Sequence, residues 1–396
     1  MTRFFVFLSL LLSGCTSGPG IVETGNPKLY ISTTGEGDLG VWQVESGAFS
    51  LEWQVAAPFT GEISYAYRVS GTCSSASDYG FRPCTLVAAS CEARASACPG
   101  SIPAIGDTYE LLELPGVALF AYAAAQTRLH IGVLRASCDT EISGDFTYLN
   151  SALNRQEVFG QFRTDSSLQD IVRSAFSFRF PGTPSLFYYG SGTGQVSVTG
   201  EATCADGVRT IPTGTAATRA TVTESGLLLL SYPFPFGGAF AFRTDQAAEA
   251  AELANKTFLG YVFKEGGGST MARLRTGARS GGGVAYASLE YRTGSQPDLT
   301  GHFIQDVPDI GSAYGFDGVP PSFFGGSYAD NLLSSSYPTP AQVPGLLIDR
   351  GGTGADNFTL LTAMRTGTGK LLVFSTTMNS SGGIIKTVGT AAYMEQ

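Results

Sequence analysis

Apolar and polar residues alternate with a period of two along much of the chain beyond its first thirty residues. Odd-numbered residues from Ile63 to Val69 are apolar, and the residues between them are mostly small or polar. A second alternating segment runs through Ala285, Ala287, Leu289 and Tyr291. This period is typical of a β-strand with one face on a core and the other in solvent. Glycine-rich breaks separate such segments at short intervals, which predicts antiparallel strands of a barrel or a sandwich.

One hairpin and one helix stand out from this pattern. The segment NFTLLTAMR-TGTG-KLLVFSTTM, residues 357–378, is typical of two strands joined by a tight turn, because Gly367 and Gly369 can take positive φ angles. Residues 245–256 (DQAAEAAELANK) predict a helix with Asp245 as its N-cap and a stripe of alanines on one face. Helix is otherwise scarce.

The predicted fold class is therefore mainly β, with two antiparallel β units joined by a short helix. Each unit is a sandwich or an up-and-down barrel, and the barrel would resemble the lipocalin kind that encloses a small ligand. The expected organisation is a signal peptide (1–14), a flexible tether (15–27), a first β domain (28–244), a linking helix (245–256) and a second β domain (257–396). The second domain is expected to hold about eight strands.

The amino-terminal residues predict export. Arg3 precedes an apolar run of nine residues from Phe4 to Leu12, broken only by a serine. A helix of nine residues rises about 14 Å, which is too short for a hydrocarbon core of about 30 Å but fits a signal peptide. The run ends in Leu12-Ser13-Gly14-Cys15, which resembles the lipobox of bacterial lipoproteins.

This resemblance implies cleavage by signal peptidase II and acylation of Cys15. One acyl chain alone gives marginal membrane binding, but several chains on one residue make a stable anchor. The residue after the cysteine is Thr16 rather than aspartate, which in such lipoproteins points to the outer membrane. The sequence thus predicts an outer-membrane protein that is attached by lipid on Cys15, on the periplasmic face or at the cell surface.

Six further cysteines predict disulfide bonds. An even number of cysteines in an exported chain is typical of a disulfide framework. No C-x-x-C pair occurs, and neither histidine lies near the cysteines, so a tetrahedral zinc site is poorly supported. Four of the six fall in a loop-like stretch near 71–100, which predicts a stapled insertion rather than sheet. The candidates are Cys73, Cys84, Cys91, Cys98, Cys138 and Cys204.

Composition and charge exclude some partners. Charged residues make up 14% of the chain and the formal net charge is -9. Nucleic-acid binding depends on clusters of lysine and arginine, so we expect no nucleic-acid partner. Two tryptophans, Trp42 and Trp53, are either core residues or part of a sugar-stacking surface.

Candidate catalytic and metal-binding residues are few. The chain has two histidines, His130 and His302, and no G-x-S-x-G motif, so no Ser-His-Asp site is predicted. We assign both histidines structural roles in strands, and we assign no catalytic residue and no cofactor. Acidic residues in two loops offer Ca²⁺-type ligands, but their spacing fits no EF-hand, and no metal ligand is assigned. These residues are Asp306, Asp309, Asp317, Asp349 and Asp356.

The function that these features favour is a non-enzymatic binding, adhesion or envelope role. The partner would be a ligand, a glycan or a protein at the outer membrane. The alternative is an anchored hydrolase that acts on polysaccharide with a pair of carboxylates, because such chemistry needs two acidic residues at a set distance and no recognisable motif.

Overall fold

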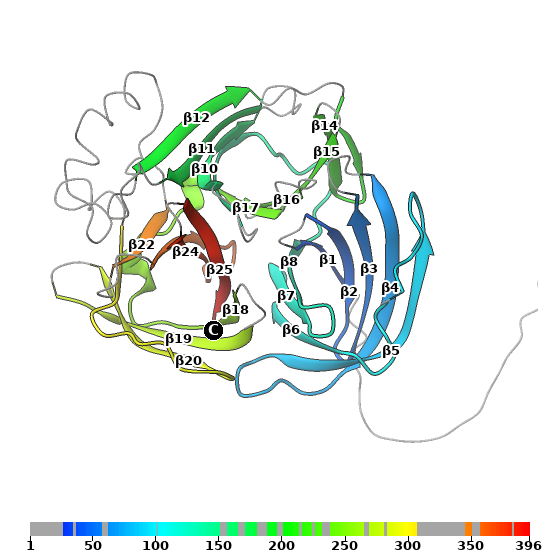
Figure 1. Ribbon diagram of the computed structural model, residues 1–396, viewed down its shortest axis with the longest axis horizontal. Helices are drawn as coiled ribbons and strands as arrows, with labels where there is room; N and C mark the ends of the chain where they lie inside the picture. Colours follow the sequence, from blue (N-terminus) through cyan, green and yellow to red (C-terminus); the bar gives the residue numbers. More distant parts are fainter. Residues whose placement is uncertain are drawn as a thin grey trace, which may run out of the picture.

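The computed structural model describes most of the chain from residue 27 onward. The described residues are 27–34, 37–57, 62–100, 102–150, 157–164, 171–179, 188–195, 201–213, 216–223, 226–231, 238–264, 269–280, 283–306, 345–350, 357–381 and 384–396. The predicted signal peptide, the lipobox and most of the tether lie outside these residues. Three β units surround a common centre (Figure 1).

The first unit, the N-terminal barrel, is a closed barrel of eight antiparallel strands. Each strand pairs with the next along the chain, and β1 pairs with β8 to close the barrel. Its strands are β1 (Lys28–Thr33), β2 (Leu39–Val44), β3 (Ala48–Ala56), β4 (Ile63–Cys73), β5 (Arg82–Ala93), β6 (Thr108–Leu114), β7 (Ala118–Ala123) and β8 (Arg128–Leu134).

Aromatic side chains fill the interior of this barrel. Trp42 and Trp53 are 0% and 3% exposed, so they are core residues and not a sugar-stacking surface. His130 lies between them, with its ring edge-on to both indoles at centroid distances of 5.3 and 4.9 Å. The indole N–H groups of Trp42 and Trp53 donate to Ser32 Oγ and Asp38 Oδ2, at 2.9 and 3.0 Å. Buried indoles need such partners, which β1 and the turn before β2 supply.

The second unit, the connecting sheet, has nine strands in the order β12-β11-β10-β9-β17-β16-β15-β14-β13. The first and last strands of this unit in chain order, β9 and β17, pair with each other in the middle of the sheet. Two meanders therefore join at this pair. The strands are β9 (Gly144–Asn150), β10 (Glu157–Thr164), β11 (Ile171–Arg179), β12 (Tyr188–Gln195), β13 (Thr203–Ala205), β14 (Val208–Thr213), β15 (Ala216–Val222), β16 (Leu227–Ser231) and β17 (Gly238–Arg243). The range assigned to the first β domain, 28–244, thus holds both a barrel and a sheet.

The third unit, the C-terminal barrel, is a second closed barrel of eight antiparallel strands, and the expectation of about eight strands is confirmed. Strand β18 pairs with β25 to close it. The strands are β18 (Thr257–Lys264), β19 (Thr270–Ala278), β20 (Val284–Tyr291), β21 (Phe303–Asp306), β22 (Leu346–Arg350), β23 (Asn357–Arg365), β24 (Leu371–Ser381) and β25 (Ile384–Glu395). The predicted hairpin is β23–β24, and Gly369 in its turn has a φ of 77°.

The predicted helix at 245–256 is wrong. The segment forms two single 3-10 turns, η1 (Thr244–Gln246) and η2 (Ala250–Leu253). Tertiary contacts override the helix propensity of its alanines. Arg365 donates to the carbonyl of Ala247 and to both carboxylate oxygens of Glu252, and Leu253 is fully buried in the core of the C-terminal barrel. The segment therefore plugs one end of that barrel.

All six candidate cysteines form disulfides, as predicted. The pairs are Cys73–Cys84, Cys91–Cys98 and Cys138–Cys204. The prediction that the first four lie in a stapled insertion rather than sheet is wrong for three of them, because Cys73 lies in β4 and both Cys84 and Cys91 lie in β5. Cys73 and Cys84 are direct partners in the two strands, and the serine- and alanine-rich sequence between the cysteines hides the strand pattern.

The expectation that one face of each strand lies in solvent is wrong where the units meet. All six residues of β7 are buried, because the outer faces of both barrels pack on each other and on the connecting sheet in one apolar cluster. Tyr122 of the N-terminal barrel stacks on Tyr261 of the C-terminal barrel, with centroids 4.5 Å apart. Phe240 of the connecting sheet stacks on Phe374, with centroids 4.8 Å apart.

A β-bulge corrects the alternation that we predicted through Ala285, Ala287, Leu289 and Tyr291. The pairing of β19 with β20 shifts register between Arg275 and Thr276, so that Ala287 has no direct partner. An extra residue reverses the side to which later residues point. As a result, Tyr286 lies on the interior of the barrel together with Leu289 and Tyr291.

Candidate functional site

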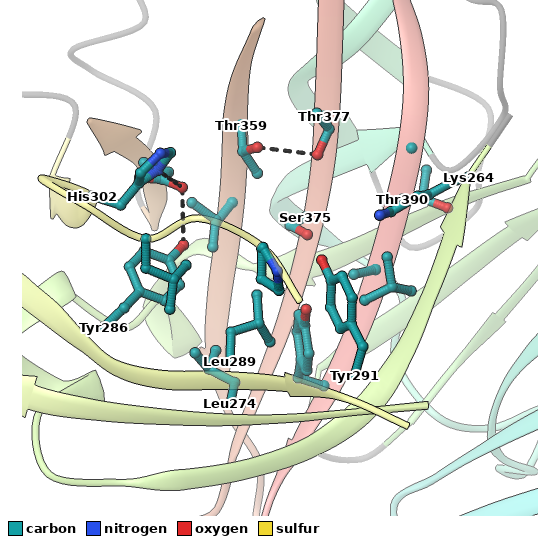
Figure 2. Close-up of a pocket in the computed structure, with 18 of the residues that line it drawn as sticks. Lys264, Leu274, Tyr286, Leu289, Tyr291, His302, Thr359, Ser375, Thr377 and Thr390 are labelled. Carbon is teal, nitrogen blue, oxygen red and sulfur yellow. Dashed lines mark hydrogen bonds and ion pairs between the residues drawn. The ribbon is translucent and has the colours of Figure 1, made fainter. Parts of the chain in front are cut away.

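A cavity of about 420 Å³ lies inside the C-terminal barrel (Figure 2). It lies at the end away from the η2 plug, because Thr359 lines it near the start of β23, whereas Arg365 at the end of that strand contacts η2. Ligand sites commonly occupy the mouths of β-barrels and have volumes of this order. The segment between β20 and β21 also contributes to the wall, through Pro297, Asp298, Leu299 and His302. The N-terminal barrel has the same number of strands, but its interior is filled by rings.

One row of directly paired residues crosses five strands and forms the polar level of the cavity. Strand partners link Asp349 to Thr359, Thr359 to Thr377, Thr377 to Gly389 and Gly389 to Lys264. The hydroxyl oxygens of Thr359 and Thr377 lie 3.0 Å apart in a hydrogen bond. The row therefore has a carboxylate at one end, an ammonium at the other and hydroxyls between them.

The next row toward the plug is mainly apolar. Leu361 pairs with Ser375, Ser375 with Ala391, and Ala391 with Val262. Leu274 and Leu289, which are partners on β19 and β20, complete this level. Inward-pointing residues of a barrel form such layers because alternate positions of each strand face the interior. The cavity is thus polar at its mouth and apolar at its floor.

A cluster of Tyr286, His302 and Asp349 lines one side of the mouth, and Figure 2 shows Tyr286 and His302 there. His302 Nδ1 lies 3.2 Å from each carboxylate oxygen of Asp349, and the Tyr286 hydroxyl donates to Oδ2 at 3.2 Å. The side chains of His302 and Asp349 are 25% and 12% exposed. The carboxylate is therefore held by two groups of its own chain at this partly buried place.

Three tyrosines border the cavity and remain protonated at neutral pH. Burial is the largest cause that raises the pKa of Tyr286, Tyr291 and Tyr393 above the ordinary value. The nearby carboxylate of Asp349 raises the pKa of Tyr286 further. Neutral phenols can donate and accept hydrogen bonds, so these residues add polar contacts without adding charge.

Lys264 lies across the mouth from the histidine (Figure 2). Its ammonium sits over the ring of Tyr291, 4.8 Å from the centroid. In the described part of the chain, no ion pair or hydrogen bond to this ammonium is found. A cation over an aromatic face keeps its N–H groups available for another partner.

Of the candidate residues named from the sequence that the structure describes, His302 and Asp349 line the cavity, and the others do not. His302 and Asp349, which are far apart in the sequence, meet at the cavity, whereas His130 is buried in the other barrel. Asp306 accepts a hydrogen bond from the backbone N–H of Ala250 at 3.0 Å. The remaining acidic loop candidates and Cys15 lie outside the described residues. Those candidates are Asp309, Asp317 and Asp356.

Burial lowers the pKa of His130 to about 3, and the charge of Arg128 adds to the effect. Its Nδ1 lies 3.4 Å from Ser32 Oγ, and its Nε2 has no partner in the described structure. This histidine is neutral at physiological pH and has no access to a substrate. The structural role assigned to it from the sequence agrees with this position.

Among the described residues, no group of three or more His, Cys, Asp or Glu side chains could hold a metal ion. No helix in these ranges is long and apolar enough to cross a membrane.

Sequence reasoning missed the cavity itself. The feature of the sequence that indicates the cavity is a set of small residues at alternate positions of β24 and β25, namely Ser375, Thr377, Gly389 and Ala391. Small inward side chains leave the interior of an eight-stranded barrel incompletely filled. Their meaning depends on the register of the two strands, which the structure supplies.

Comparisons with known proteins give little further information. No protein-family model matches the chain, and no curated protein matches it. Among solved structures, the chain is similar to transferrin binding protein B from Haemophilus parasuis Hp5, a vaccine antigen crystallised as a double mutant. The identity is 6% and the TM-score 0.19, over 91% of this chain and 66% of that one, just under two thirds of its length. At this TM-score the similarity does not bear on function.

Proposed function

We propose that the protein is a lipid-anchored binding protein of the bacterial envelope, with a small-molecule site in the C-terminal barrel. The cavity of about 420 Å³ is the observation that carries this proposal. A concave, mainly apolar site with a few polar groups at its mouth is typical of ligand binding.

The anchor is proposed on the lipobox at Leu12–Cys15. Mass spectrometry of the native polypeptide is expected to show a chain that begins at Cys15 and carries acyl groups. The variant Cys15→Ser is expected to lose membrane attachment. An unmodified Met1, or cleavage elsewhere with no added lipid, would remove the anchor and the outer-membrane location from the proposal but leave the ligand site unaffected.

The ligand site can be tested by filling the cavity at Gly389. A Cβ built on Gly389 would meet Phe263 O at 3.4 Å, Thr377 Cβ at 3.6 Å and Thr377 Oγ1 at 3.8 Å, which are ordinary contacts. Valine suits a β-strand, so Gly389→Val is expected to fold and to project into the cavity. Gly277→Val on β19 is the matched control, because a Cβ there meets nothing within 4 Å.

The probe is N-phenyl-1-naphthylamine, an uncharged dye that fluoresces in apolar surroundings. The full chain with Cys15→Ser is expected to bind it at one saturable site. Binding is expected to be lost in Gly389→Val and kept in Gly277→Val. Absence of saturable binding, or equal binding by both variants, would refute a ligand site in this barrel.

The hydrolase alternative has one observation in its favour, since both Asp298 and Asp349 line the cavity. A retaining or inverting glycosidase needs one carboxylic acid that stays protonated, usually in an apolar setting. Hydrogen bonds from the backbone and side chain of Thr300 instead lower the pKa of Asp298, and Asp349 accepts bonds from Tyr286 and His302. The lowered pKa of Asp298 does not suit an acid that stays protonated, so binding is favoured. Release of reducing sugar from envelope polysaccharides that is lost in Asp298→Asn would reverse this preference.

A further inference from the structure

The polar row of the cavity contains a gap at Gly389. Gly389 has no side chain and stands between Lys264 on β18 and Thr377 on β24. Adjacent strands lie about 4.8 Å apart, so the two flanking backbones are separated by about 10 Å across this glycine. The space above Gly389 is thus bordered by an ammonium on one side and a hydroxyl on the other.

Hydrogen-bond donors predominate around this gap. The ammonium of Lys264 carries three N–H donors, and no ion pair to it is found in the described ranges. The bonded pair of Thr359 and Thr377 uses one hydroxyl hydrogen between them and leaves the other to donate. Ser375 lies one row deeper and faces the same cavity.

Both carboxylates of the cavity already accept hydrogen bonds from groups of the protein. Asp349 accepts from His302 and Tyr286, and Asp298 accepts from the backbone N–H of Thr300 at 2.9 Å. Asp298 and Lys264 are both exposed, so solvent screens both charges. Lys264 is the charged residue that directly borders the gap, because its strand partner is Gly389.

We propose that the cavity takes a small organic anion with an apolar body, whose acidic group sits over Gly389 between Lys264 and Thr377. The apolar body then lies on the deeper row of Val262, Leu361 and Ala391, next to Leu274 and Leu289. This proposal rests on the proposed ligand site and adds its chemical class. It deepens that function without depending on the lipid anchor.

The test uses three competitors with one eight-carbon chain and different head groups. Octanoate, 1-octanol and octylamine each displace N-phenyl-1-naphthylamine from the full chain with Cys15→Ser. Octanoate is expected to bind about ten-fold more tightly than 1-octanol, the factor that one charge-assisted hydrogen bond of about 1.4 kcal/mol gives. Octylamine is expected to bind least well.

Two variants separate a local from a general effect of charge. Lys264→Met is expected to reduce the octanoate-to-octanol affinity ratio about ten-fold. Lys370→Met, in the β23–β24 turn at the other end of the barrel, makes the same change in net charge and is expected to keep the ratio. An unchanged ratio in Lys264→Met, or a preference for 1-octanol or octylamine in the parent chain, would overturn the anion proposal. Failure of the dye to bind at all would refute the ligand site itself, so the two failures are distinguishable.

Discussion

Buried His130 is expected to limit the acid stability of the N-terminal barrel. Its pKa is about 3 in the folded chain, against 6.5 for an ordinary histidine. Above pH 6.5 neither the folded nor the unfolded chain binds a proton at this residue. As the pH falls below 6.5, the unfolded chain takes up the proton first, because burial opposes the charged form in the fold. Stability is therefore lost on acidification.

The magnitude follows from the pKa difference. One pKa unit corresponds to about 1.4 kcal/mol, so the free energy of unfolding falls by that amount per pH unit below 6.5. Between pH 7 and pH 5 the loss from this one residue is about 2 kcal/mol. The variant His130→Leu has no titrating group at the same place and a similar volume. It also removes the Nε2 atom that lacks a partner in the described structure.

The assay is urea unfolding followed by tryptophan fluorescence at pH 7 and pH 5. The chain has two tryptophans, and both lie in the interior of the N-terminal barrel, so the signal reports that barrel. The parent and the variant share all other titrating groups, which cancel in the difference between them. The loss on going to pH 5 is expected to be about 2 kcal/mol smaller in His130→Leu. Equal losses of unfolding free energy between pH 7 and pH 5 in the parent and the variant would refute the assignment of this pH dependence to His130.

Three further changes test the packing of the units. Leu253→Ala removes the buried residue that plugs the C-terminal barrel and is expected to lower the free energy of unfolding by about 3 kcal/mol, measured in urea. Cys138→Ser with Cys204→Ser opens a loop of sequence separation 66 and is expected to lower the free energy of unfolding by about 4 kcal/mol. Cys91→Ser with Cys98→Ser opens a loop of separation 7 and is expected to lower it by about 2 kcal/mol. A reversed order of the urea unfolding midpoints of these two variants would contradict the loop model. Phe374→Ala removes the ring stacked on Phe240 and is expected to lower the melting temperature more than Phe303→Ala, whose ring is only partly buried.

Local signals in the sequence predict the strands well. The alternation from Ile63 to Val69 gives the face of β4 correctly, since Tyr67 and Val69 lie in the interior of the N-terminal barrel. The paired segments around Gly369 give the β23–β24 hairpin, because turn chemistry and strand pattern agree there. The even number of cysteines in a chain with an export-like start predicts that all six form disulfides, but the structure alone supplies which cysteine pairs with which.

Features that depend on contacts between distant segments escape such analysis. The alanines of 245–256 favour a helix locally, but the guanidinium of Arg365, more than a hundred residues later, holds the segment as a plug. The bulge at Ala287 reverses the alternation of β20 without any glycine or proline to announce it. His302 and Asp349 meet only because β21 pairs with β22, and that pairing sets which residues reach the cavity.

The two barrels have equal strand numbers, so the size of their inward side chains explains why the C-terminal barrel contains a cavity. Strand number largely sets the diameter of a barrel, so eight strands enclose about the same interior in both units. In the N-terminal barrel that interior is filled by large rings such as Trp42, Trp53 and Tyr109. In the half of the C-terminal barrel away from the η2 plug, small residues such as Gly389, Ala391 and Ser375 face inward. The volume that they leave unfilled is the cavity. The small residues that weaken the packing of one barrel are thus the ones that leave its cavity, while the other barrel supplies a solid core to which it is packed.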